Sequence, residues 1–319
     1  MSKDVINTRL VLVLPNTHEN PVKQRKREKT GRIISLVFIY AFLVFAAMLT
    51  IFPFYYMIAA SFMSEADVLK GRMFPEFATL IDNLASNYSE TFNRLNYMRY
   101  VGNTLLVSGT ITIFQLLTTI LASFAFAKLQ FKGKDILFIF FLATMMVPGE
   151  LLAISNYITL SKMNLAGLNQ EGLQAFLAMV LPLIASPFYI YLLRQNFMQI
   201  PKELYLAAKM DGKSDWQFLW KVMVPLASPT IITIIILSLI GGWNNYVWPN
   251  LVVYDSRYTL ISVIIRGPAL TYQGPDGLFV TKYSWQMTAS VMTVAPLLVL
   301  FVIFRKYIMR GTGRAGIKG

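Results

Sequence analysis

The stretch from residue 200 to residue 229 decides how this sequence is interpreted. It begins Ile200-Pro201-Lys202-Glu203-Leu204-Tyr205-Leu206-Ala207-Ala208-Lys209-Met210-Asp211-Gly212 and ends Pro225-Leu226-Ala227-Ser228-Pro229. Pro201 suits the start of a helix, where its missing N–H costs nothing. Gly212 suits the end of one, and Ser214 with Gln217 has the form of a capping box for a second short helix. The pattern predicts a helix–turn–helix at the membrane surface, which contacts either a partner protein or only lipid.

The rest of the chain is that of a polytopic membrane protein. Its 319 residues are 55% hydrophobic and 14% charged, whereas soluble domains carry roughly a quarter charged residues. The sequence has no cysteine, which excludes disulfides and cysteine-ligated metals. Its one histidine, His18, lies in a polar tail, so histidine chemistry inside the membrane is excluded.

Charge-free segments predict six membrane helices, because a span needs about 20 apolar residues. The segments are 33–60, 99–128, a third that begins after Asp135 and meets a breaking signal at Pro148-Gly149-Glu150, 171–194, 221–255 and 282–305. We therefore predict an all-α protein with a basic tail at 1–32, a permease domain at 33–308 and a C-terminal tail at 309–319. Glu150 suggests either a polar cavity or an outer-end residue in water, and its position favours water.

Lysine and arginine counts predict the orientation of these helices. The tail, the 128–134 turn, the 194–221 loop and the C-terminal tail together hold 21 of them, and the opposite loops hold 8. Such an excess marks the cytoplasmic side. Both termini and the 194–229 loop are therefore expected in the cytoplasm of a cell membrane.

Several motifs in a fixed order resemble the maltose-type permeases of bacterial ABC importers. The carriers of the resemblance are the Ala207-Ala208, Asp211-Gly212 and Pro225-Leu226 pairs, which are similar to the "EAA" loop, together with Ala125-Phe126-Ala127-Lys128-Leu129, Met145–Glu150, Gly242-Trp243-Asn244-Asn245-Tyr246 and Ala315–Gly319. The resemblance runs from about Phe52 to Gly319. It implies the six-helix type I importer fold and a non-enzymatic role in sugar uptake.

The resemblance also implies partners and site residues. The partners are a second permease, two copies of an ATPase and an extracytoplasmic sugar-binding protein, with no cofactor or metal. The ATPase contact would be made by Glu203, Ala207, Ala208, Asp211, Gly212 and Pro225. The usual glutamate before the alanine pair is Leu206 here, and Glu203 lies one helical turn earlier.

Two outer segments are further candidates for function. The first lies late in the fifth span and consists of Trp243, Asn244, Asn245, Tyr246 and Trp248. Their aromatic rings and amides suit a sugar pathway. They suit equally an interfacial aromatic belt whose amides are satisfied between helices. The second is the last outer loop, which contains Tyr272, Gly274, Pro275, Asp276 and Gly277. It is either a plain turn or, as the resemblance implies, a contact with the binding protein.

Other mechanisms have less support from the sequence. The chain has no G-x-x-x-x-G-K-S/T loop, so a different polypeptide must hydrolyse any ATP that drives transport. An ABC permease for another solute such as a peptide is one alternative. An ion-driven secondary transporter is the other, although it predicts ionisable residues at mid-membrane that most of the spans lack.

Overall fold

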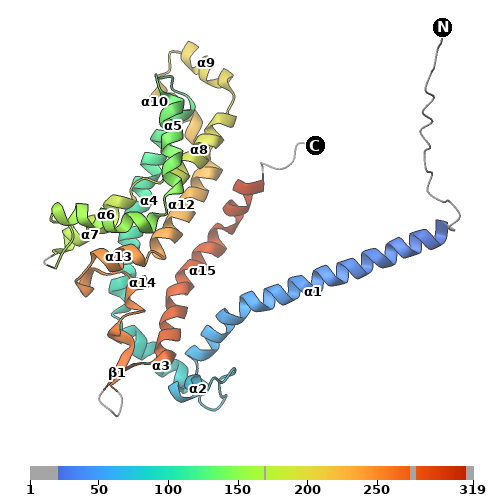
Figure 1. Ribbon diagram of the computed structural model, residues 1–319, viewed down its shortest axis with the longest axis vertical. Coiled ribbons are helices and arrows are strands. Elements are labelled where there is room, and N and C mark those ends of the chain that lie inside the picture. Colours follow the sequence, from blue (N-terminus) through green and yellow to red (C-terminus); the bar gives the residue numbers. More distant parts are fainter. Residues whose placement is uncertain (1–20, 169, 274–277, 314–319) are drawn as a thin grey trace, which may run out of the picture. The chain divides into compact units, whose positions relative to one another are not determined.

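The computed structural model describes residues 21–168, 170–273 and 278–313 (Figure 1). The chain divides into two compact units, Met1–Tyr56 and Met57–Gly319, and each is described by itself. The first unit contributes most of one long helix. The second holds every other element named below.

Helices account for most of the described chain. The α-helices are α1 (Pro21–Ser61), α2 (Glu65–Leu69), α3 (Leu80–Arg94), α4 (Tyr97–Ala127), α5 (Lys134–Ala143), α6 (Gly149–Lys162), α7 (Gly172–Val180), α8 (Pro187–Gln199), α9 (Lys202–Met210), α10 (Asp215–Phe218), α11 (Val224–Leu226), α12 (Ser228–Trp243), α13 (Val247–Val252), α14 (Ile261–Ile264) and α15 (Tyr283–Gly313). Short 3₁₀ turns are η1 (Thr144–Met146), η2 (Leu181–Leu183), η4 (Ser256–Tyr258) and η5 (Pro268–Leu270), η3 (Leu219–Met223) is a π-helix, and β1 (Thr271–Gln273) pairs antiparallel with β2 (Phe279–Thr281).

Membrane-length helices occur where the apolar segments predict them. Three are continuous, at Gly31–Ser61, Tyr97–Ala127 and Tyr283–Arg305. Three more are bent pairs of the required length and composition, which brings the total to as many as six in the described chain. The all-α, multi-span architecture is confirmed.

Each bent pair breaks at a proline. Helices α5 and α6 meet at 99° around Val147-Pro148, as the sequence predicts, and Glu150 lies exposed in the first turn of α6. Helices α7 and α8 meet at 48°, with Ser186 capping α8 and Pro187 in its first turn. The third pair, Asp215–Leu226 with Ser228–Trp243, forms the fifth span and bends by 79° next to Ala227, just before Pro229. Proline lacks the N–H that would continue the helix, so these positions interrupt it.

Helix α4 is the centre of the second unit. It packs against α8 on one side and α12 on another, and α12 in turn packs against α15 (Figure 1). The contact with α12 depends on Gly242, because a side chain there would begin 2.7 Å from Cβ of Ser108. Small residues allow such close backbone approach between membrane helices.

A polar network joins α4 to the break in the fourth span. Nε2 of Gln115 donates to the carbonyl of Leu183 at 2.7 Å, and Oγ1 of Thr118 donates to that of Ile184 at 2.8 Å. Oγ of Ser238 in α12 donates to Oε1 of Gln115 at 2.6 Å. The break frees carbonyls that lipid cannot satisfy, and these side chains satisfy them.

The two ends of the second unit carry different elements. Helix α9 lies at one end of the α4–α8–α12 bundle, and the β1–β2 hairpin lies at the other (Figure 1). The fifth span ends at Trp243, whereas the charge-free segment that predicts it continues to residue 255. Residues 244–246 break the helix, and Val247–Val252 forms the separate helix α13.

Candidate functional site: the 201–222 loop and the outer segments

The 201–222 loop is the helix–turn–helix that the sequence predicts. Helix α9 ends in a Schellman motif, in which the N–H of Gly212 donates to Lys209 at 3.0 Å and that of Lys213 donates to Ala208 at 2.9 Å. Gly212 has φ +72°, the left-handed value that this motif requires. Ser214 and Gln217 form the predicted capping box of α10. The turn is therefore specified by its own sequence.

A polar contact crosses the turn and fixes the two helices relative to each other. The hydroxyl of Tyr205 donates to Oδ1 of Asp215 at 2.6 Å, and Nζ of Lys209 lies 2.8 Å from the same oxygen. The hydrogen bond to Asp215 raises the pKa of Tyr205 and also raises the pKa of Lys209. Each shift favours the protonated donor, so the contact persists at neutral pH.

The base of the loop is anchored in the helix bundle. Phe218, Leu219 and Met223 are buried, in one core cluster with Leu193 and Phe197 of α8. The π-helix Leu219–Met223 and Pro225 then lead into the 79° bend before α12. A displacement of the loop would therefore be transmitted directly to α8 and α12, because close-packed cores deform little.

The loop exposes large apolar side chains among its charged ones. Leu206 is 60% exposed, Met210 90% and Trp216 60%. Exposed apolar side chains outside the predicted spans make this loop a candidate interaction site.

The residues assigned to the ATPase contact occupy different positions on the loop. Ala207 is exposed beside Leu206, whereas Ala208 is half-buried against the core cluster. Asp211 and Glu203 are exposed, and the carboxylate of Glu203 lies close enough to Lys128 to influence its ammonium group. Pro225 lies in α11, where the loop joins the bundle.

The aromatic and amide segment at the end of the fifth span divides into buried and accessible residues. Both tryptophans are buried, and each indole N–H donates to a backbone carbonyl: Trp243 to Thr293 at 3.3 Å and Trp248 to Ala178 at 3.1 Å. Asn244 is exposed, and Asn245 is half-buried. Tyr246 is also half-buried, and the guanidinium of Arg266 lies 4.3 Å from its ring centre. The tryptophans hold helices together, and the accessible side chains of the segment are those of Asn244, Asn245 and Tyr246.

The loop before the last span contains the β-hairpin. Tyr272 is half-buried in β1 and pairs with Val280 of β2. Gly274, Pro275, Asp276 and Gly277 lie outside the described residues. The two strands were not anticipated from the sequence, because each is only three residues long.

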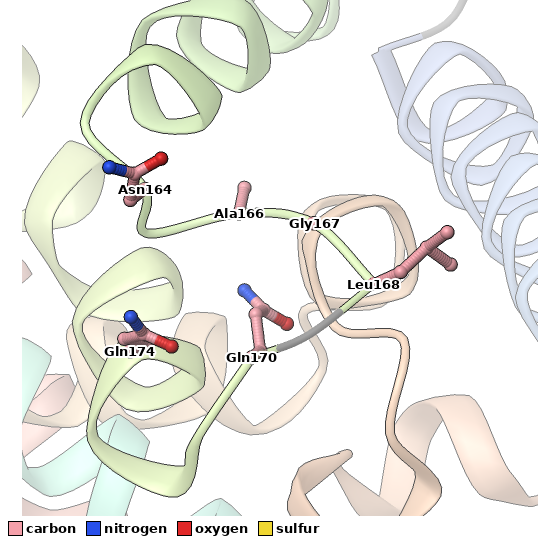
Figure 2. Close-up of a pocket in the computed structure, with 6 residues that line it drawn as sticks. All are labelled: Asn164, Ala166, Gly167, Leu168, Gln170 and Gln174. Carbon is pink, nitrogen blue, oxygen red and sulfur yellow. The ribbon is translucent and has the colours of Figure 1, made fainter.

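A pocket of about 250 Å³ lies between α6 and α7. Figure 2 shows Gln170 directed toward the Ala166–Gly167 segment with Gln174 beside it, while Leu168 points away. Within the described chain, Oε1 of Gln170 is buried without a hydrogen-bond partner. The described lining holds amides and no charge, so it suits neutral hydroxyl groups better than ions.

Two groups with clear structural roles were not singled out in the sequence. Gln115 is one, and a side-chain amide in the middle of an apolar span is the signal that was available. Glu65 is the other: its carboxylate accepts from the N–H groups of Tyr283 at 3.0 Å and Ser284 at 2.9 Å, so it caps the start of α15. That pairing joins residues more than 200 apart, and local pattern does not contain it.

Comparisons with known proteins agree with this architecture. The chain is 29% identical over 296 residues to the arabinooligosaccharides transport system permease protein AraQ of Halalkalibacterium halodurans, a match that covers 92% of this chain and 100% of the relative. It is 26% identical over 283 residues to the sn-glycerol-3-phosphate transport system permease protein UgpE of Yersinia pestis, covering 86% and 95%.

A solved structure shares the fold. It is that of a bacterial ABC transporter involved in the import of the acidic polysaccharide alginate, with a TM-score of 0.73 at 22% identity over 87% of this chain and 97% of that one. The family of binding-protein-dependent transport system inner membrane components matches residues 115–314. That segment holds the 201–222 loop and four of the six spans, so the chain belongs to this family of membrane-spanning transport components and is not itself an enzyme.

Proposed function

We propose that this protein is a permease subunit of an ATP-driven importer of sugars or oligosaccharides, and that its 201–222 loop contacts a separate ATPase subunit. The substrate class is supported by the names of the relatives, among which a transporter of arabinooligosaccharides is prominent. Membership of a binding-protein-dependent family does not support the ion-driven alternative. The similarity to UgpE makes a phosphorylated polyol the second candidate substrate class, so sn-glycerol 3-phosphate is included in the uptake assay.

One observation carries the ATPase contact. The loop is rigidly capped, its outer surface exposes Leu206, Met210 and Trp216, and its base is buried in the core of the bundle. A loop that touched only lipid would have no need of both a fixed shape and a buried base. In the proposed mechanism, closure of two ATPases moves the loop, and α8 and α12 tilt with it. Coupling requires that ATP binding and solute release favour the same conformation.

The other site residues take roles that follow from their exposure. Asn244, Asn245 and Tyr246 line part of the solute pathway together with the second permease, while Trp243 and Trp248 hold the surrounding helices in place. The 271–281 hairpin with Tyr272 contacts the extracytoplasmic binding protein. It lies at the opposite end of the bundle from α9, as a contact across the membrane requires (Figure 1). Both termini lie in the cytoplasm on this proposal.

The experiment compares Ala207→Trp with a matched change elsewhere. Ala207 is exposed on α9, so a large ring there keeps the local fold but prevents close approach of a partner. Ala143→Trp, at the exposed C-terminal end of α5, is the control. Both variants should reach the membrane, and only Ala207→Trp should lose co-purifying ATPase and solute-stimulated ATP hydrolysis.

The outcomes separate the parts of the proposal. If Ala207→Trp retains the ATPase and full stimulation, the loop is not the contact. Uptake of labelled arabinotriose, lactose and sn-glycerol 3-phosphate by cells that express the complete transporter tests the substrate class. Uptake of the phosphorylated polyol alone would overturn the sugar assignment and leave the coupling proposal standing.

A further inference from the structure

Five basic residues occur at the base of the 201–222 loop, where α4 ends and α5 begins, and four of them act on one another electrostatically, namely Lys128, Lys134, Arg194 and Lys202. We name them the basic cluster: Lys128, Lys132, Lys134, Arg194 and Lys202. They come from four segments that are separate in sequence, namely the end of α4, the 129–134 turn into α5, α8 and the start of α9. The lysine and arginine count predicts cations on this side of the membrane, but not their convergence.

Hydrogen bonds bring these segments together. Nζ of Lys128 donates to the carbonyl of Ile200 at 2.8 Å, which joins the end of α4 to the residue just before the loop. Nε of Arg194 donates to the carbonyl of Phe126 at 3.1 Å. Nζ of Lys134 donates to the carbonyl of Leu129 at 2.9 Å, across the turn. Lys128, Arg194 and Lys134 are therefore held in place rather than free to separate.

The cluster contains more positive than negative charge. Burial lowers the pKa of Lys128. The nearby charges of Lys202 and Lys134 lower this pKa further, and the carboxylate of Glu203 raises it. Asp135 is the only acid among the groups that act on Lys134. Among these interacting groups, two carboxylates thus oppose four cations. Each lysine that donates one hydrogen bond keeps two further N–H donors, so the cluster can still bind an anion.

The neighbouring surface identifies the kind of anion. Helix α5 begins at Lys134 and at once exposes apolar side chains: Ile136 is 64% exposed, Ile139 65% and Phe140 70%. Lys134–Met146 is one half of a membrane-length pair, so the cluster lies where a span meets water. A soluble anion would have no use for the apolar face, whereas a phospholipid has a phosphate for the cations and acyl chains for α5.

We propose that the basic cluster binds the phosphate headgroup of an anionic phospholipid, with an acyl chain along the exposed face of α5. Basic pockets between membrane helices recognise such headgroups. Because Lys128 also holds Ile200, the bound lipid lies directly at the base of the 201–222 loop. It would stabilise the position of that loop by screening the repulsion among the cations of the cluster.

The test measures lipid binding on the full-length chain. The chain, with whatever subunits co-purify, is mixed with phosphatidylglycerol or phosphatidylcholine in detergent, and retained lipid is counted by native mass spectrometry. The test variant is Lys132→Gln with Lys134→Gln. The control is Lys70→Gln with Lys162→Gln, which removes the same charge at two exposed lysines outside the cluster.

We expect selective loss in the test variant. One lysine near an anionic headgroup contributes about 1 kcal/mol, or about fivefold in affinity, so two removed lysines should weaken phosphatidylglycerol retention roughly 25-fold. The control should retain it, and phosphatidylcholine should bind weakly to both. Millimolar inorganic phosphate should not displace the lipid, since it lacks the acyl contact.

Three outcomes would overturn the proposal. Equal retention of phosphatidylglycerol by the test and control variants would show that the cluster is not the site. Full displacement by inorganic phosphate would make it a site for free anions. Normal lipid retention with loss of co-purifying ATPase from the test variant would make it a protein contact. None of these readouts depends on the transported solute.

Discussion

Gly212 offers the sharpest test of the 201–222 loop, because its role depends on backbone conformation alone. Its φ is +72°, and a Cβ built there meets nothing within 4 Å. A substitution would therefore cause no clash with neighbouring atoms. It would act only through the left-handed backbone, which costs an ordinary L-residue about 1–2 kcal/mol.

The expected effect can be graded by residue type. Gly212→Asn should be nearly neutral, because asparagine visits the left-handed region readily. Gly212→Ala should lose about 1–2 kcal/mol, which lowers the ratio of closed to open turn by about 5- to 30-fold. Gly212→Val should lose more, since β-branched residues are genuine outliers at positive φ. The opened state loses the Gly212-to-Lys209 and Lys213-to-Ala208 hydrogen bonds.

Hydrogen exchange of residues 208–215 measures the opening, and co-purified ATPase with solute-stimulated ATP hydrolysis measures its consequence. All three variants should insert, because the membrane spans are untouched. Protection and stimulation should fall together in the order Asn, Ala, Val. Equal behaviour of Asn and Val would refute the argument from backbone conformation. Lost protection with full stimulation would show that the shape of the loop does not matter for coupling.

Further predictions concern orientation, the pathway, the bundle and the turn. Single cysteines at Ser214 and Ser256 should label from opposite sides of intact cells, and labelling of both from outside would contradict the proposed topology. Asn245→Leu should slow uptake without disturbing assembly, whereas normal uptake would favour a purely structural segment. Gln115→Leu should remove the donor to the carbonyl of Leu183 and leave Ser238 with Thr112 as its side-chain partner, which should destabilise the bundle by about 1 kcal/mol and lower its melting temperature. Gln115→Glu also lacks the amide N–H and should lower the melting temperature too, whereas an unchanged value would show that the amide N–H does not matter. Asp215 raises the pKa of Lys209, so this contact stabilises the turn below the ordinary pKa of lysine and is lost as pH rises through the raised value; hydrogen exchange at alkaline pH in wild type and Asp215→Asn checks it.

Local pattern determined much of this protein. Apolar segments free of charge placed the spans, since a bilayer admits only helices or closed barrels in which the backbone satisfies itself. Pro148 marked the break in the third span, and Gly212 with Ser214 marked the turn and cap of the 201–222 loop. Each of these signals depends on a few neighbouring residues, so it can be recognised without the tertiary structure.

Tertiary structure alone decided which side chains are available. Trp243 and Asn244 are neighbours in sequence, and both side chains suit contact with a sugar. The indole of Trp243 is nevertheless buried against Thr293, whereas the side chain of Asn244 is exposed. Likewise, Ala207 faces outward and Ala208 packs inward, because a helix turns about 100° per residue. Burial depends on what packs from distant segments, and one sequence position does not encode that.

The polar contacts between distant segments also came only from the fold. Gln115 satisfies a carbonyl 68 residues away, and Lys128 one that is 72 residues away. The sequence predicts that a broken helix and a charged turn need partners, because unpaired polar groups are costly in lipid. It does not say which side chains supply them, since that depends on how α4 and α8 pack side by side.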